Sequence, residues 1–261
     1  MSEFYDPDVY DASTQPVPGD VDFYLELARE ADAAGQKVLE LACGTGRVAI
    51  PIAREGIRVV GLDRSAAMLG RAREKSAGMS TVRWVEGDMR EFSLPESFGL
   101  AFIAFRSFQH VLTVAGQLSC LSSIHRHLVP GGRLALHIFN PDIVRIAGWL
   151  TVRRGSAQTI RGEFTHPETG HRAKRWEQPS YQTAEQRLDV AFVDEQIDEE
   201  GAVFSRIYRD LKLRYTFRYE MEHLLARTGF AVEALYGDFT GAPFDDRSLE
   251  MVWVARRPGE S

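Results

Sequence analysis

Residues 40–46, with the sequence Glu-Leu-Ala-Cys-Gly-Thr-Gly, constrain the fold of this chain more than any other segment. The apolar run at residues 38–41 predicts a strand, and residues 47–54 have the spacing of a helix. Glycine has no Cβ and tolerates positive φ, so a glycine-rich turn lets the backbone approach a ligand closely. A strand that enters such a turn and opens a helix is typical of a parallel α/β sheet.

The alternation of strands and helices continues after this turn. A helix at residues 20–35 precedes the first strand. Further strands are predicted at residues 57–62, 81–85, 98–105 and 133–139, and further helices at residues 65–76 and 117–128. Because strands that alternate with helices are joined by right-handed crossovers, the pattern predicts a parallel sheet.

Residues 151–217 interrupt this alternation. Three strands are predicted there, at residues 172–176, 188–197 and 203–217, and they indicate an antiparallel β insertion. The α/β pattern returns with a helix at 220–227 and strands at 230–236 and 250–255. We therefore predict an N-terminal segment and helix (1–35), a main domain (36–150 and 218–261) and the insertion (151–217). The first 20 residues are expected to form a loop up to the first helix.

Composition and charge exclude several classes of protein. The chain has 261 residues, of which 44% are hydrophobic, and this is enough for a buried core. Its net charge of −6 and its scattered basic residues give no footprint for nucleic acid or an anionic membrane. The N-terminus lacks the features of a signal peptide, and the two cysteines, Cys43 and Cys120, have no zinc-type spacing. We expect a cytoplasmic protein that acts on a small neutral or cationic molecule.

The glycine turn by itself is compatible with two kinds of cofactor. Gly44, Gly46 and Ala49 fit the pattern of a dinucleotide-binding turn, and Asp63 lies at a suitable distance along the chain. A nicotinamide enzyme is therefore one interpretation. Glu40 argues against it, because a carboxylate at the strand end is poorly matched to a pyrophosphate. The ammonium and sulfonium groups of S-adenosylmethionine need such acidic surroundings.

Two more carboxylates follow predicted strands. Asp63 ends the second strand, where it can accept both ribose hydroxyls of an adenosine. Asp88, in the segment Gly-Asp-Met, follows the third strand, where it can accept a hydrogen bond from an adenine amine. Each signal alone is also compatible with an ordinary acidic turn. Their order along the chain, followed by the segment Leu-Val-Pro-Gly-Gly at 128–132, is what makes the pattern specific.

Four segments, LELACGTGR, VVGLDRS, EGDMREF and HLVPGGRLALHIF, resemble the successive motifs of class I S-adenosylmethionine-dependent methyltransferases. The resemblance implies a Rossmann-like α/β/α sandwich, whose mostly parallel seven-stranded sheet has an antiparallel last strand. It also implies S-adenosyl-L-methionine as cofactor and S-adenosyl-L-homocysteine as product. The residues expected at the cofactor are Glu40, Ala42, Cys43, Gly44, Gly46, Asp63, Arg64, Met68, Asp88, Met89 and Phe105.

The N-terminal tyrosine-aspartate segment and the insertion are similar to those of small-molecule methyltransferases, including bacterial sugar N-methyltransferases. Methyl transfer requires alignment of the acceptor, exclusion of water and, where needed, removal of a proton. His110, after the fourth strand, is the candidate base, with a hydrogen-bonded turn histidine as the alternative. Tyr10 is a second catalytic candidate, because Tyr5 and Tyr10 lie in a segment that can form a lid, where a phenol would orient the amine or cover the sulfonium. The alternative is an aromatic anchor of the N-terminal arm. Arg106 and Asn140 are candidate contacts of the acceptor.

The sequence thus predicts methyl transfer to an amine or hydroxyl of a small molecule by in-line displacement. Two alternatives stay open, an NAD-dependent oxidoreductase and a non-catalytic S-adenosylmethionine-binding module. No metal is expected, because the sequence has no dense cluster of histidine and acidic residues. His137 lies inside a predicted strand and is expected to be a sheet residue rather than a catalyst. The insertion is expected to wall the acceptor pocket or to pair with a second subunit, in a monomer or a homodimer.

Overall fold

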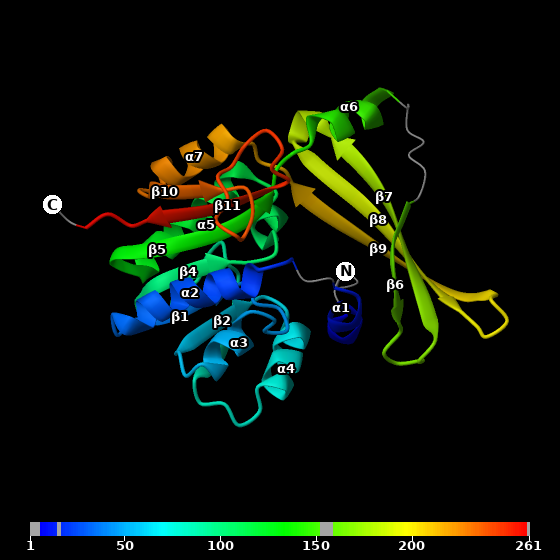
Figure 1. The fold of residues 1–261 in the computed structure, drawn as a ribbon, viewed down its shortest axis with the longest axis horizontal. Coiled ribbons are helices and arrows are strands. Elements are labelled where there is room, and N and C mark those ends of the chain that lie inside the picture. Colours follow the sequence, from blue (N-terminus) through cyan, green and yellow to red (C-terminus); the bar gives the residue numbers. More distant parts are fainter. Residues whose placement is uncertain (1–5, 15–16, 152–158, 260–261) are drawn as a thin grey trace. The chain divides into compact units, whose positions relative to one another are not determined.

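A computed structural model describes residues 6–14, 17–151 and 159–259 (Figure 1). The chain divides into two compact units. The larger unit contains residues 16–141 and 216–261, and the smaller unit contains residues 1–15 and 142–215. We describe each unit separately.

The larger unit is built on a seven-stranded sheet with the strand order β10-β11-β5-β4-β1-β2-β3. Its strands are β1 (Lys37–Leu41), β2 (Val59–Asp63), β3 (Val82–Glu86), β4 (Phe98–Ile103), β5 (Leu128–Phe139), β10 (Ala231–Tyr236) and β11 (Glu250–Arg256). The first five strands pair in parallel, whereas β11 is antiparallel to both of its neighbours. The predicted Rossmann-like sheet with an antiparallel last strand is confirmed.

Helices form a layer on each face of this sheet (Figure 1). They are α2 (Asp20–Ala33), α3 (Ala49–Arg54), α4 (Ala66–Lys75), α5 (Val114–His127) and α7 (Arg218–Arg227), with the short 3₁₀ helix η1 (Ser107–His110) after β4. One apolar cluster packs α5 and α7 against the sheet, and a second packs α2 and α3. Strand β1 is buried along almost its whole length, as expected of a central parallel strand.

The smaller unit is a four-stranded antiparallel sheet with two helices. The strands are β6 (Thr159–Thr165), β7 (Arg172–Gln182), β8 (Arg187–Ile197) and β9 (Val203–Arg214), in this order across the sheet. The 3₁₀ helix η2 (Thr183–Glu185) joins β7 to β8, and the helices are α1 (Pro7–Ser13) and α6 (Ile143–Thr151). The antiparallel insertion was predicted, but β6 and α6 were not.

The expectation that the first 20 residues form a loop is wrong, because α1 lies within them. Asp6 accepts hydrogen bonds from the backbone nitrogens of Asp8 and Val9, both at 3.0 Å, and Pro7 occupies the first helical turn. These capping signals are present in the sequence. The expected start of the fifth strand is also late, since β5 begins at Leu128, directly after α5, and pairs there with Phe98.

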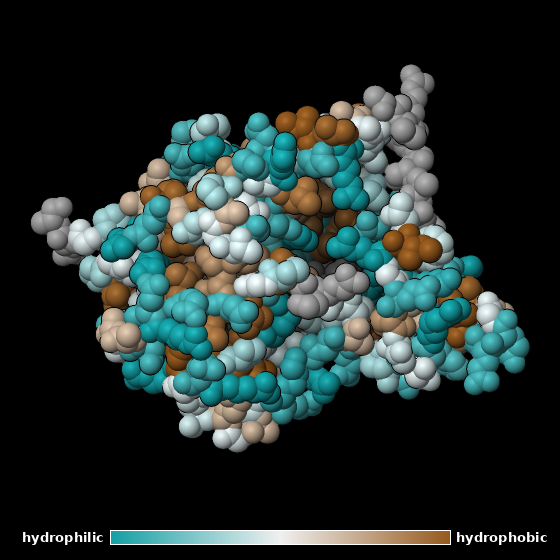
Figure 2. Space-filling model, in the orientation of Figure 1, coloured by the Kyte–Doolittle hydropathy of each residue, from teal (hydrophilic) through white to brown (hydrophobic). Residues whose placement is uncertain are grey.

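The surface mixes polar and apolar residues (Figure 2). An apolar patch lies over α6, where the exposed fractions of Ile143 and Val144 are 68% and 83%. In the described ranges, no helix is both long enough and apolar enough to span a membrane.

Trp253 gives a test of the core of the larger unit. It lies on β11, pairs with Leu136 of β5 and Leu235 of β10, and is only 1% exposed. Trp253→Ala should lower the free energy of unfolding by about 3–5 kcal/mol, because it leaves a large cavity in the sheet. Tyr219→Ala, at a residue 65% exposed, should change it by less than about 0.5 kcal/mol. Urea unfolding measures both, and equal effects would contradict this assignment of the core.

Candidate functional site

The glycine turn after β1 is held in a tight, partly left-handed conformation. Ala42, Gly44 and Gly46 have φ values of 53°, 55° and 79°. A Cβ on Gly46 would lie 2.7 Å from Trp84 and 2.8 Å from Ile50, which is too close for any side chain. Only glycine therefore fits at position 46.

Asp63, at the end of β2, is hydrogen-bonded to the neighbouring turn. Its Oδ2 accepts from the backbone nitrogen of Gly44 at 2.8 Å, and its Oδ1 accepts from that of Ser65 at 2.9 Å. Burial raises the pKa of this carboxyl, and the two backbone hydrogen bonds partly oppose the rise. The side chain therefore joins the carboxyl end of β1 to the start of α4.

Glu40 is the most unusual carboxyl in this region. It is 2% exposed, and its Oε2 has no hydrogen-bond partner among the residues that the structure describes. Burial raises its pKa to about 8, although the nearby Arg47 guanidinium acts in the opposite direction. Arg47 is committed elsewhere, because it forms a two-point ion pair with buried Asp20 at 3.0 and 2.5 Å. The carboxyl end of β1 thus contains a buried carboxyl oxygen that can accept a further hydrogen bond.

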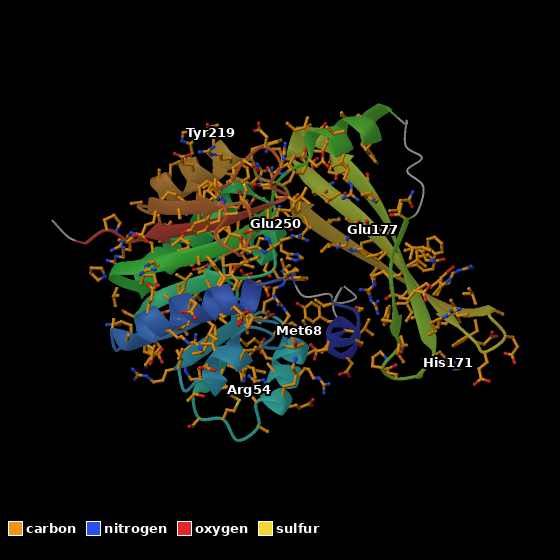
Figure 3. All side chains as sticks on the ribbon, viewed as in Figure 1. Arg54, Met68, His171, Glu177, Tyr219 and Glu250 are labelled. Atoms are coloured by element: carbon orange, nitrogen blue, oxygen red, sulfur yellow. The ribbon has the colours of Figure 1, made fainter. Side chains whose placement is uncertain are left out.

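The segment after β3 places Asp88 at the same edge of the sheet. The Asp88 carboxylate binds the Arg90 side chain and accepts from the Arg90 backbone nitrogen at 2.8 Å, so Arg90 lowers its pKa. Met89 is partly buried against the core. On α4, the end of the Met68 side chain (Figure 3) lies 3.3 Å from the position that a Cβ on Gly44 would occupy. Met68 therefore covers one side of the glycine turn.

Two residues after β4 have left-handed backbone conformations that non-glycine residues rarely adopt. They are Phe105 and Arg106, with φ values of 52° and 65°. Arg106 is held by an ion pair with Glu250 of β11 (Figure 3), and Nε2 of His137 lies 2.7 Å from the same carboxylate. His137 is therefore a bonded sheet residue, as predicted. Arg106 fixes the turn that leads into η1.

His110 ends η1, beyond this strained turn. Burial lowers its pKa to about 4, and the positive charge of Arg64 acts in the same direction. The imidazole is therefore neutral at physiological pH. Asn140, after β5, donates from Nδ2 to the Ser248 carbonyl at 2.8 Å, so this amide is bonded to the loop before β11.

The remaining predicted residues are distributed between the two units. Cys43 is a buried free cysteine in the glycine turn of the larger unit, and burial raises the pKa of its thiol. Tyr10 lies on α1 of the smaller unit, and Tyr5 lies outside the described residues.

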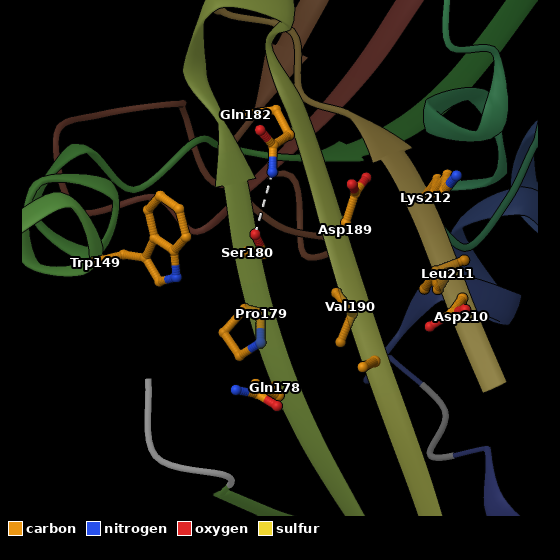
Figure 4. A pocket seen from close by; sticks show the side chains of 11 residues that line it. Trp149, Gln178, Pro179, Ser180, Gln182, Asp189, Val190, Asp210, Leu211 and Lys212 are labelled. Carbon is orange, nitrogen blue, oxygen red and sulfur yellow. Dashed lines mark hydrogen bonds between the residues drawn. The ribbon is translucent and has the colours of Figure 1, made fainter. Parts of the chain in front are cut away.

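The smaller unit contains an open cavity of about 580 Å³ over its antiparallel sheet (Figure 4). Its lining includes two cross-strand rows of β7, β8 and β9, which are Gln178-Ala191-Asp210 and Ser180-Asp189-Lys212, together with Pro179, Val190 and Leu211 of the row between them. Trp149 of α6 borders the cavity and contacts Tyr181 edge to face, with ring centroids 6.0 Å apart. The volume suits a small organic ligand. Sequence reasoning did not place this cavity, because it did not predict α6.

The chain is similar to several known methyltransferases. Residues 38–132 match a family described as a methyltransferase domain. The cypemycin N-terminal methyltransferase of a Streptomyces species is 27% identical over 223 residues, which are 85% of this chain and 84% of that protein. The CcbJ methyltransferase from Streptomyces caelestis is 27% identical, with a TM-score of 0.77 over 98% of this chain and 100% of that one. CalS10, an amino pentose methyltransferase from Micromonospora echinaspora solved with S-adenosylmethionine bound, has the same fold at 23% identity, with a TM-score of 0.69 over 95% and 94% of the two chains.

The raised pKa of Glu40 makes the stability of the protein depend on pH. An unfolded glutamate ionises near 4.5 and folded Glu40 near 8, so the free energy of unfolding falls as the pH rises between these values. Glu40→Gln removes this loss, and its advantage over the natural protein should grow from pH 5 to pH 8 by at most about 1.4 kcal/mol per pH unit.

Urea unfolding at several pH values measures this difference. The control Glu74→Gln changes an exposed carboxylate that pairs with Arg71, and it should give no comparable trend. Parallel stability curves for Glu40→Gln and the natural protein would show that Glu40 ionises normally in the folded state.

Proposed function

Because this chain belongs to the class I S-adenosylmethionine-dependent methyltransferases, we propose that it methylates an amine of a small molecule. The cofactor is S-adenosylmethionine, and the product formed from it is S-adenosylhomocysteine. The amine is supported by the relatives, since one is named for an N-terminus and others are described as sugar or glycopeptide N-methyltransferases. An NAD-dependent oxidoreductase and a non-catalytic module are not favoured.

The residues at the carboxyl edge of the sheet fit this cofactor. The assignment rests on Glu40. Its buried Oε2 has no hydrogen-bond partner in the described part of the chain, and a carboxyl in this position is suited to a cationic group. The ammonium of the methionyl part satisfies this need, whereas a pyrophosphate does not. We propose that Gly44 and Gly46 border the methionyl part, that Asp63 accepts from the ribose, and that Asp88 accepts from the adenine.

The other predicted cofactor contacts are proposed on the same basis. Cys43 and Ala42 form the glycine turn with the residues already described, and Met68 covers one side of it. Arg64 follows Asp63 directly, Met89 follows Asp88, and Phe105 lies in the strained turn after β4. We propose that these residues enclose the cofactor.

The bound cofactor supplies a methyl group on a positively charged sulfur. Held by Glu40, the glycine turn and Asp63, it would supply this methyl group to the amine nitrogen and would leave as the neutral thioether, S-adenosylhomocysteine. The nitrogen then releases one proton. We propose that His110 relays this proton, because its imidazole is neutral at physiological pH, although its lowered pKa makes it a weak base. An imidazole with a pKa near 4 does not retain a proton at neutral pH, so the proton passes on to solvent.

Cofactor binding gives the first test. Asp63→Ala should weaken the binding of S-adenosylhomocysteine by about 10- to 100-fold, because it removes a charged acceptor of hydrogen bonds. Asp63→Asn retains one side-chain oxygen and should be milder. The control Asp22→Asn, at an exposed residue of α2, should bind as the natural protein does. Calorimetric titration measures all four proteins, and equal affinity in Asp63→Ala would contradict the proposed ribose contact.

The role of His110 is tested by turnover. With amino sugars and short peptides as acceptors, His110→Gln should lower kcat by about 100- to 10,000-fold and leave the affinity for S-adenosylhomocysteine unchanged. The control is His223→Gln, on the exposed surface of α7. Mass spectrometry of the products identifies the methylated atom. Unchanged kcat would remove His110 from the mechanism, and methylation of hydroxyls alone would contradict the amine.

A further inference from the structure

Asp20 and Arg47 form a nearly buried ion pair in the larger unit. Asp20 is the first residue of α2 and is 1% exposed, and Arg47 follows the glycine turn, with a side chain that is 19% exposed. Nη1 and Nη2 of Arg47 donate to the two carboxylate oxygens of Asp20, at 3.0 and 2.5 Å. The guanidinium also lies over the ring of Phe105, 5.0 Å from its centroid. These contacts fix the direction of the Arg47 side chain.

Arg47 also acts on a second carboxyl, that of Glu40. Burial raises the pKa of Glu40 to about 8, and the charge of Arg47 and a backbone hydrogen bond from Ala49 act in the opposite direction. The negative charges of Asp63 and Asp20 add to the rise. Between the two carboxyls, the guanidinium binds Asp20, and Oε2 of Glu40 has no hydrogen-bond partner in the described part of the chain.

Two further ionisable side chains near Glu40 are neutral. Burial raises the pKa values of the Tyr24 hydroxyl and the Cys43 thiol, and the negative charge of Glu40 adds to both rises. Neither group therefore offers Glu40 a positive charge. The direction of the Arg47 side chain thus decides whether Glu40 is paired with this cation or is left open to a ligand.

We propose that Asp20 is a positioning residue of the cofactor site. By binding Arg47, it keeps this guanidinium away from Glu40 and leaves the Glu40 carboxyl to the ammonium of S-adenosylmethionine. The inference rests on the proposed function, because it concerns the same site. Asp20 also offsets the positive charge of Arg47, which would otherwise repel the ammonium.

Two ligands test whether Asp20 acts on the ammonium. S-adenosylhomocysteine carries this group, whereas 5′-methylthioadenosine has the same nucleoside without the amino-acid part. Asp20→Asn should weaken the binding of S-adenosylhomocysteine by at least about tenfold and that of methylthioadenosine by less than about threefold. Asp22→Asn, at an exposed residue of the same helix, is the matched control and should bind both ligands as the natural protein does. Calorimetric titration at pH 7 measures all the affinities.

A double variant separates positioning from a structural role. Asp20→Asn combined with Arg47→Gln removes the competing cation together with its partner. It should restore the affinity for S-adenosylhomocysteine to within about threefold of the natural value. If the pair only stabilised the fold, the double variant would remain as weak as Asp20→Asn, because it lacks the same ion pair.

The stability of the cofactor-free protein gives a second readout. In Asp20→Asn, pairing with Arg47 would stabilise the ionised form of Glu40. The fall in the free energy of unfolding between pH 5 and pH 8 should therefore be smaller than in the natural protein, and the double variant should retain the full fall. Urea unfolding at several pH values measures this difference.

If Asp20→Asn does not unfold cooperatively, the natural protein provides the test. Glu40 is mainly protonated at pH 7 before the ligand binds, so S-adenosylhomocysteine should release close to one proton per molecule bound. Titrations in phosphate and in Tris buffer, which differ in their heats of ionisation, measure this release. Binding without proton release would contradict the proposal, because Glu40 would not become ionised when the ammonium binds.

The proposal is also overturned if Asp20→Asn binds S-adenosylhomocysteine as the natural protein does, if it weakens both ligands equally, or if the double variant does not recover. Failure of the natural protein to bind S-adenosylhomocysteine would instead contradict the methyltransferase function. The pH dependence of unfolding would still show whether Asp20 holds Arg47 away from Glu40.

Discussion

The hydrogen bond from the Gly44 nitrogen to Asp63 connects the two strands on which the larger unit depends. Strands β1 and β2 are parallel neighbours, so their carboxyl ends meet, and Asp63 joins the turn after β1 to the first residues of α4 through Ser65. This carboxylate is partly buried, and its pKa is raised, so the protein places it there at an energetic cost. Such a cost is expected where a fold prepares a site for a ligand.

The same edge of the sheet contains the strained backbone of the protein. Three of the four non-glycine residues with positive φ in the described chain, Ala42, Phe105 and Arg106, follow the adjacent strands β1 and β4. The ion pair of Arg106 with Glu250, together with the contact of His137 with that carboxylate, holds the second of these turns. Strained turns let the backbone approach a ligand, and the charged contacts behind them keep the turns from relaxing.

The sequence was sufficient for the sheet of the larger unit and for the order of its motifs, because both depend on local patterns: alternating elements and acidic strand ends. It was not sufficient for α1, where the cap at Asp6 and Pro7 was present but the short segment was interpreted as a loop. Nor did it predict α6, β6 or the cavity. Helix α6 is a short amphipathic segment of nine residues whose helical spacing was not recognised. The cavity depends on how Trp149 of α6 packs beside the consecutive strands β7, β8 and β9, and this packing is not a local pattern. The burial that raises the pKa of Glu40 also depends on packing rather than on local sequence.

The two units differ in how their buried ionisable side chains are paired. In the larger unit, Glu40 is a buried carboxyl with an unused oxygen among the described residues. In the smaller unit, Arg209 and Arg175 share the single carboxylate of Asp194. Burial raises the pKa of Glu40 to about 8, so its carboxyl is mainly protonated at neutral pH in the protein alone. A cationic cofactor beside Glu40 would favour the ionised carboxyl, so the larger unit would select its ligand by charge as well as by shape.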